Sequence, residues 1–125
     1  KENQFLHVVP VLKGYDSIAE MKNIFELGAI DSSWLENMLE RVAVLSDYHF
    51  GGYGKYTEEL LIFIKDFYKE HKLRLDPIYT GKTMFATLKE LQSDSYNGKN
   101  VLFVHTGGVQ GADHIIKRSG IDLYA

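Results

Sequence analysis

The 125-residue sequence contains no cysteine and only two prolines, and it has no long uninterrupted apolar run. Without cysteine it forms no disulfides and offers no thiolate metal ligands or cysteine nucleophiles. A membrane-spanning helix needs about 18 or more consecutive apolar residues, and no segment provides them. The formal net charge of -3 gives no electrostatic basis for binding nucleic acid. We therefore expect neither a nucleic-acid nor a membrane partner, and a cytoplasmic location.

The sequence has the composition of an ordinary folded protein, with 45% hydrophobic and 25% charged residues. A chain of this length fits one domain or part of one, so residues 1–125 are treated as a single unit. Lys1 is followed by no secretory signal, and the apolar segment 5–12 starts at once as a strand. We expect from this opening that the chain is a cut or processed piece of a longer protein.

Hydrophobic periodicity and capping residues predict an alternation of strands and helices, which favours an α/β fold with a mostly parallel sheet. The apolar runs Val8–Leu12 and Val101–Val104 are typical of buried parallel strands. A first helix is expected between Asp16 or Ser17 and Gly28, followed by a segment capped by Ser32 or Ser33 whose end at 42–45 could equally be a short strand. Thr57 caps the next expected helix, and a further helix begins at Thr80 or Thr83 with Met84, Phe85, Leu88 and Leu91 inward. The last expected helix covers about 111–118.

Three loops collect the unusual residues, and each one leads into the start of a helix. They read HFGGYGKY from His49, DPIYTGKT from Asp76 and HTGG from His105. In open α/β sheets ligands bind beyond the carboxyl ends of the strands, where helix starts present free N–H groups. We therefore expect the three loops to form edges of one pocket.

Neither Gly-Lys pair forms a nucleotide-binding phosphate loop. That motif needs a glycine five residues before the Gly-Lys pair, and His49 and Asp76 stand at those positions. A metal site is equally unsupported, because the five histidines are scattered and none pairs with another at helical spacing. We interpret His105 as a structural histidine at a strand end.

The hydroxyl groups of the loops suit a flat organic cofactor better. Tyr53 lies between glycines, Tyr79 stands just before a helix start, and Thr106 precedes two glycines. A phenol can orient a substrate or relay a proton, and a threonine hydroxyl can bond a ring nitrogen without adding charge. From composition alone, the alternative that both tyrosines merely pack and the glycines merely turn the chain stays open.

The strings LDPIYTGKTMFATL and NVLFVHTGG, in that order, together with the loop GGYGKYTEE, resemble the C-terminal signature of one enzyme family. This is the family of D-cysteine desulfhydrases and 1-aminocyclopropane-1-carboxylate deaminases. The resemblance covers most of the chain from Val8 to Gly108. It implies the three-layer αβα architecture of fold-type II enzymes that use pyridoxal 5'-phosphate, a small amino acid as substrate, and a homodimer.

The resemblance also implies roles for individual residues. Tyr53 and Tyr79 would be catalytic and face the cofactor and substrate, while Thr106, Thr80 and Gly107 would bind the cofactor. Deaminases acting on aminocyclopropane-carboxylate carry glutamate where this chain has Thr80. A carboxylate beside the ring nitrogen strengthens the electron sink that ring opening requires, whereas eliminating a thiol needs less help. We therefore expect a desulfhydrase-like reaction that yields a keto acid and ammonia, with the deaminase as the alternative.

The sequence also departs from the family. After HTGG it continues as VQGADHIIKRSG, where relatives usually have a short proline-containing stretch. The lysine that binds the cofactor and the phosphate-binding loop belong to the family's N-terminal half, and neither Lys55 nor Lys82 replaces that lysine. We interpret Lys82 as structural or anion-facing. The chain by itself is expected to be inactive, and a family member that serves only as a binding module stays an alternative.

Overall fold

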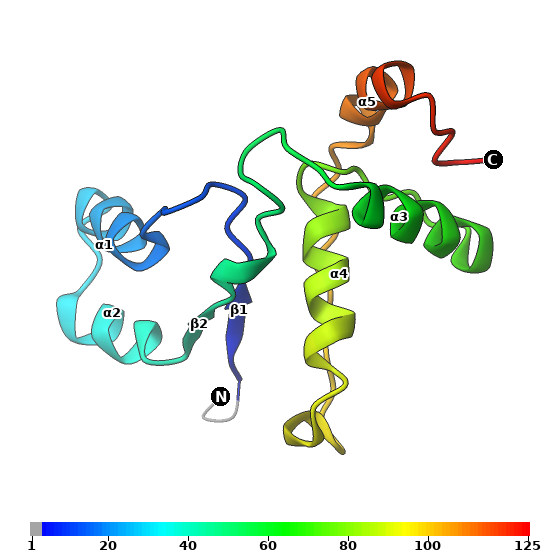
Figure 1. Ribbon diagram of the computed structural model, residues 1–125. Helices are drawn as coiled ribbons and strands as arrows, with labels where there is room; N and C mark the ends of the chain where they lie inside the picture. Colours follow the sequence, from blue (N-terminus) through cyan, green and yellow to red (C-terminus); the bar gives the residue numbers. More distant parts are fainter. Residues whose placement is uncertain (1–3) are drawn as a thin grey trace.

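The protein is described here from a computed structural model covering residues 4–125, in which helices dominate (Figure 1). None of its helices in that range is both long and apolar enough to cross a membrane. In chain order the elements are β1 (Leu6–Val8), α1 (Ser17–Leu27), α2 (Ser32–Leu39), β2 (Val42–Val44), α3 (Glu58–His71), α4 (Thr80–Glu90) and α5 (Ala112–Ser119), with short 3-10 helices at Ser46–Tyr48, Asp94–Tyr96 and Val109–Gly111.

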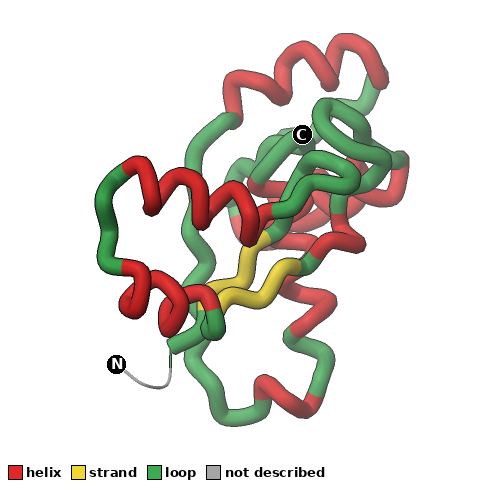
Figure 2. Tube along the Cα trace, turned by 90° about the vertical axis from the view of Figure 1, so that its left-hand side faces the viewer, coloured by secondary structure: helices red, strands yellow, loops and turns green. Residues whose placement is uncertain are grey.

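β1 and β2 form a parallel pair in which Leu6 lies opposite Val42 and Val8 opposite Val44. Parallel neighbours need a crossover connection, which α1 and α2 supply here (Figure 2). The mixture of helices with a small parallel sheet confirms the α/β character predicted from the sequence. Among the described residues the sheet has two strands, so the three-layer arrangement stays a prediction.

Side-chain caps mark where α1, α2 and α3 begin, as the sequence predicts for α1 and α3. The Asp16 carboxylate accepts the Ala19 N–H at 2.9 Å, and the Thr57 hydroxyl accepts the Leu60 N–H at 3.3 Å. Gly28 follows the last residue of α1, also as expected. The cap of α2 is Asp31, one residue before the predicted Ser32.

The apolar core is built around α3. Leu60 and Ile64 are fully buried on this helix. The same cluster contains residues from the following loop, from α4 and α5 and from the C-terminal segment: Leu61, Leu75, Met84, Ala112, Ile115 and Leu123. This core fixes the first turns of α4 against α3, and the three loops named above lie around that helix start.

Two expectations about apolar segments are wrong. Residues Val101–Val104 form no strand, and Leu102 is 87% exposed. An apolar run becomes a strand only where a neighbouring strand accepts its backbone hydrogen bonds, and the described residues provide none for it. Leu88 and Leu91, expected inward on α4, are 39% and 38% exposed.

The first strand is also shorter than predicted, since β1 ends at Val8 rather than continuing to Leu12. The Val8 carbonyl still accepts the Leu45 N–H at 2.8 Å, but Pro10 has no N–H to extend the ladder. The chain therefore turns away from the sheet before Ser17.

Gly81 allows α4 to approach α3 closely. A Cβ at this position would lie 2.5 Å from Ile64 Cδ1 and 2.6 Å from the Asp76 carbonyl oxygen. We expect Gly81→Ala to lower the free energy of unfolding by about 1–3 kcal/mol, the usual cost of overpacking. Urea denaturation measures this. Gly111→Ala is the control, because its Cβ would meet Ile78 at an ordinary 3.6 Å, and equal effects of the two variants would contradict the prediction.

Candidate functional site

The turn before α4 is organised by the buried carboxylate of Asp76. Its oxygens accept the backbone N–H groups of Ile78 at 2.8 Å, Tyr79 at 2.7 Å and Thr80 at 2.9 Å. Because these donors would otherwise be unsatisfied at the helix start, the carboxylate completes the first turn of α4. In the sequence, Asp76 stands where a phosphate loop would have glycine, but Asp followed by Pro before a helix is itself a turn and capping signal that points to this role.

The hydroxyl of Thr80 belongs to the same turn. It donates to Asp76 Oδ2 and accepts the Asp76 N–H at 2.8 Å, and the residue is only 2% exposed. This geometry gives Thr80 a structural role in holding the turn. Its assignment to the cofactor site stays a prediction.

The structure brings the phenols of Tyr53 and Tyr79 together, although the two residues are far apart in sequence. The Tyr79 hydroxyl donates to that of Tyr53 at 3.4 Å, and the ring centroids lie 6.1 Å apart at an angle of 59°. The hydrogen bond to Tyr53, followed by partial burial and the charge of Asp76, raises the pKa of Tyr79. Both rings keep an exposed face, with Tyr53 57% and Tyr79 41% exposed, so both are accessible to a ligand.

The HTGG turn lies against Asp76 and Tyr79. A Cβ at Gly108 would lie 3.1 Å from Asp76 Oδ2 and 3.7 Å from Tyr79 Cδ2, and Gly107 and Gly108 both have φ of +85°. The backbone conformation therefore favours glycine at both positions, and the close approach to Asp76 requires it at Gly108. Thr106, two residues before Gly108, is exposed.

His105 holds the HTGG turn rather than a ligand. Its Nδ1 accepts the Gly107 N–H at 3.1 Å, which leaves Nε2 to donate to the Arg74 carbonyl at 2.9 Å. This agrees with its interpretation as a structural histidine. Among residues 4–125, no group of three or more His, Asp or Glu side chains could hold a metal ion.

Lys82 joins α4 to the glycine loop. Its side chain is fully buried, and Nζ donates to the carbonyl oxygens of His49 at 2.8 Å and Gly52 at 2.9 Å. Burial lowers the pKa of Lys82 to about 8, and the charge of Asp76 partly opposes this shift. Of the two interpretations made from the sequence, the structure supports the structural one.

Two aromatic side chains dock the beginning of the glycine loop on the same helix. The Tyr48 hydroxyl donates to Glu90 at 2.8 Å, and this bond raises the pKa of Tyr48. Phe50 meets Phe85 edge to face, with ring centroids 5.0 Å apart. The loop therefore lies along α4 (Figure 1), and its far end presents Tyr53 at the helix start.

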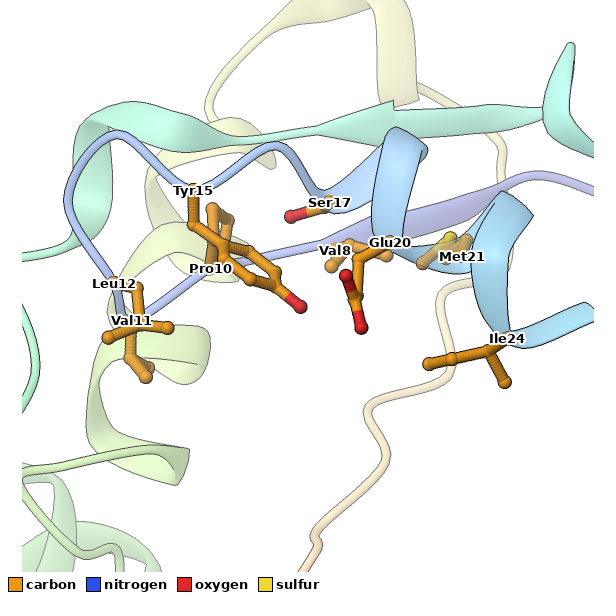
Figure 3. Close-up of a pocket in the computed structure, with 9 residues that line it drawn as sticks. All are labelled: Val8, Pro10, Val11, Leu12, Tyr15, Ser17, Glu20, Met21 and Ile24. Atoms are coloured by element: carbon orange, nitrogen blue, oxygen red, sulfur yellow. The ribbon is translucent and has the colours of Figure 1, made fainter.

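A separate apolar hollow of about 270 Å³ lies between β1 and α1 (Figure 3). Its wall includes the hydroxyl of Ser17, which is buried and makes no hydrogen bond with any described residue. None of the residues that line it comes from the three loops: they are Val8, Pro10, Val11, Leu12, Tyr15, Ser17, Glu20, Met21 and Ile24. The candidate site is therefore the loop cluster, where the hydroxyls of Tyr53 and Tyr79 meet, and not this hollow.

The hydrogen bonds of Asp76 make the helix start a sensitive point for stability. Asp76→Ala removes the acceptor for three backbone N–H groups in a buried turn, and we expect a loss of roughly 2–3 kcal/mol in the free energy of unfolding. Asp16→Ala is the matched control, because Asp16 is an exposed cap that accepts the Ala19 N–H of α1, and about 1 kcal/mol is expected there. A loss at Asp76 no larger than at Asp16 would show that the buried turn does not need its carboxylate.

The lowered pKa of Lys82 makes stability depend on pH. The folded protein loses this proton near pH 8, whereas the unfolded chain keeps it up to the ordinary pKa of 10.5. Between these values the unfolded state binds more protons, so the free energy of unfolding rises with pH by up to about 1.4 kcal/mol per unit.

Lys82→Met removes this dependence. Urea unfolding of parent and variant from about pH 7 to pH 10 should show the difference moving in favour of the parent above about pH 8. Groups common to both proteins cancel in the difference, so a difference that stays constant with pH would contradict the buried state of this ammonium.

Comparison with curated proteins gives a consistent set of relatives. A Pyrococcus horikoshii protein provisionally named 1-aminocyclopropane-1-carboxylate deaminase is 35% identical over 98 residues, which cover 70% of this chain and 30% of the relative. The bifunctional D-cysteine desulfhydrase/1-aminocyclopropane-1-carboxylate deaminase of Arabidopsis thaliana is 37% identical over 62 residues, covering 48% of this chain and 16% of the relative. The D-cysteine desulfhydrase of Klebsiella pneumoniae is 34% identical over 68 residues, covering 54% and 21%.

No family model and no solved structure matches the chain. The matched region spans less than a third of the length of each of these three relatives. The agreement among their names nevertheless confirms the resemblance found in the sequence motifs. Over more than half of its length, the chain is similar to proteins of the family of D-cysteine desulfhydrases and 1-aminocyclopropane-1-carboxylate deaminases.

Proposed function

We propose that this chain is part of a pyridoxal-phosphate-dependent lyase that eliminates the β-substituent of a small amino acid, as a D-cysteine desulfhydrase does, and releases a keto acid and ammonia. The observation that supports this most directly is the phenol pair. Tyr53 and Tyr79 meet at 3.4 Å beside the HTGG turn, at the start of a helix. The similarity to this family supplies the reaction class, and the geometry supplies groups that suit it.

The groups present fit the ring side of such a cofactor. Two exposed phenols and the exposed hydroxyl of Thr106 are neutral hydrogen-bonding groups that suit a flat heteroaromatic ring and its substituents. A Cβ at Gly107 would have no neighbour within 4 Å, so the backbone there is open to a ligand. Thr106 would hold the ring nitrogen, and Gly107 would allow the ring to approach the chain.

Lys82 does not fit the role of the lysine that binds the cofactor. Its lowered pKa is a property expected of such a lysine. Its amine, however, is fully buried and donates to two backbone carbonyls of the glycine loop. The covalent attachment point therefore belongs to another part of the full-length protein in this proposal.

When bound, the cofactor supplies an electron sink for the carbanion that forms at the α-carbon. The chain's own residues would move and hold protons around it. The raised pKa of Tyr79 keeps its phenol protonated throughout the neutral range, so Tyr79 suits donation or relay of a proton rather than its removal as a base. Tyr53, which accepts from Tyr79, would pass the proton on or orient the substrate.

The choice between desulfhydrase and deaminase depends on which residue stands at position 80, and in this chain it is Thr80. Its neutral hydroxyl is bonded to Asp76, and Asp76 directs its carboxylate to backbone N–H groups of the same turn. A ring nitrogen bonded by the neutral hydroxyl of Thr106, with no carboxylate at position 80 beside it, is a weaker electron sink, which suits elimination of a good leaving group such as a thiol. The deaminase stays the alternative, and the name of the Pyrococcus relative favours it.

The proposal predicts separate effects on cofactor and turnover in the full-length protein. With pyridoxal phosphate, the parent should show visible absorbance and should release sulfide from D-cysteine. Tyr79→Phe should keep the absorbance and lower turnover by about 10²-fold or more, as expected for loss of a proton-transfer group. Thr106→Ala should shift or weaken the absorbance band itself.

Tyr56→Phe is the matched control, since Tyr56 stands in the same loop but packs against the apolar core. It should leave both the absorbance and turnover near the parent level. A colourless parent that ignores both D-cysteine and aminocyclopropane-carboxylate would favour a family member that only binds partners. A coloured parent in which Tyr79→Phe turns over like Tyr56→Phe would remove the proposed role of the phenol pair.

A further inference from the structure

We propose that Lys82 is a positioning residue of the site: it holds the glycine loop in the conformation that places the Tyr53 phenol against Tyr79. The proposal rests on the function above for its catalytic consequence, because Tyr53 and Tyr79 are the groups positioned. The contact on which it depends, a buried amine joined to two loop carbonyls, is independent of that function.

The two carbonyls that Lys82 contacts belong to consecutive turns. The His49 carbonyl also accepts the Gly52 N–H, and the Gly52 carbonyl also accepts the Lys55 N–H, each at 3.1 Å. Nζ of Lys82 thus joins one turn that ends just before Tyr53 to another that contains it. Lys82 therefore holds the backbone that leads into Tyr53, and the turn from Gly52 to Lys55 connects this anchor to the backbone that follows Tyr53.

The same helix start carries the other phenol. Tyr79 is the residue before the first residue of α4, and Lys82 lies three positions later in the first turn. A single rigid element therefore bears both the partner of Tyr53 and the amine that positions Tyr53. The docking contacts at Tyr48 and Phe50 lie at the beginning of the loop, and Tyr56 packs against the core at its end. Lys82 contacts the segment between them, which contains Tyr53.

A long donor-only side chain suits this task. The loop has φ of +94° at Gly51, +119° at Gly52 and +66° at Gly54. Glycine loses more backbone freedom than any other residue when it is fixed in one conformation, so such a loop needs contacts that hold it. A buried amine can donate to several carbonyls at once and brings no acceptor of its own. Replacing it by an apolar side chain of similar length leaves both carbonyls without this donor.

The first test needs no enzyme activity. In the full-length protein with tyrosines labelled at ¹³Cζ, NMR follows the ionisation of Tyr79, whose pKa is raised chiefly by its hydrogen bond to Tyr53. Tyr53→Phe should lower that pKa toward the ordinary value. Lys82→Met should lower it in the same direction, because Tyr53 moves away, while Lys55→Met, on the exposed part of the same loop, should not.

Loss of charge does not explain the expected shift. Removing a nearby cation would raise the pKa of a phenol, which is the opposite direction. An unchanged Tyr79 titration in folded Lys82→Met would overturn the proposal. Should Lys82→Met fail to fold, as judged by near-ultraviolet circular dichroism, Lys82→Gln keeps N–H donors without the charge. The Tyr79 pKa should then lie between those of the parent and Tyr53→Phe, and a parent-like pKa overturns the proposal.

The second test joins position to turnover. A misplacement of about 1 Å can lower a rate by about 10²-fold, and we expect a loss of that order in Lys82→Met, mainly in kcat, with the cofactor absorbance retained. Adding Lys82→Met to Tyr53→Phe should cause little further loss, because the phenol that Lys82 positions is already gone. Fully additive losses would show that Lys82 acts in another way.

The two tests separate this inference from the proposed function. A protein that shows no lyase or deaminase activity but reproduces the Tyr79 shift in Lys82→Met disproves the function and supports the positioning of Tyr53. A protein that is active, and whose Lys82→Met variant keeps both the parent titration and the parent turnover, supports the function and overturns the positioning role.

Discussion

The arrangement of the site depends on one buried carboxylate. Asp76 accepts three backbone N–H groups and a hydroxyl within its own turn, and so determines where α4 begins. From that start the helix carries Tyr79 and Lys82 at fixed positions. The charge of Asp76 also acts on the groups around it. It contributes to the raised pKa of Tyr79 and of Tyr124, and it opposes the lowering of the Lys82 pKa by burial. The charge of this carboxylate partly offsets the cost of burying the Lys82 ammonium.

The glycine loop consists of short turns and is held against α4 by side-chain contacts. Its contacts with the helix differ in kind: a hydroxyl on Glu90, an aromatic edge on Phe85, and the amine of Lys82 on two carbonyls. Burial disfavours the charged form of that amine, which its lowered pKa records. Hydrogen bonds to two carbonyls and the nearby carboxylate offset the penalty. A loop with several residues at positive φ is thereby kept in one conformation.

Local signals in the sequence were sufficient for the helices, but not for contacts between distant segments. Asp16, Gly28 and Thr57 mark helix ends by chemistry that acts within a few residues, and each prediction is confirmed. Tyr53 and Tyr79 could be named as candidates because the family motifs single them out. The bond from Lys82 to His49 and Gly52 could not be read from the sequence, since it spans about thirty residues. The strand expected at Val101–Val104 failed because an apolar run does not specify its own pairing partner.

The exposure of the site indicates how this chain relates to the complete enzyme in the proposal. Both phenols are open on one face, and Leu102 and Val104, just before the HTGG turn, are 87% and 67% exposed. Proton transfer around a reactive carbanion requires that water be excluded. The described residues supply one wall of such a site, and the matched relatives are more than three times longer than the region they share with this chain. The proposed chemistry therefore belongs to the full-length protein, in which a second wall would cover the phenols, while the positions of the phenols themselves are determined within this chain by Asp76 and Lys82.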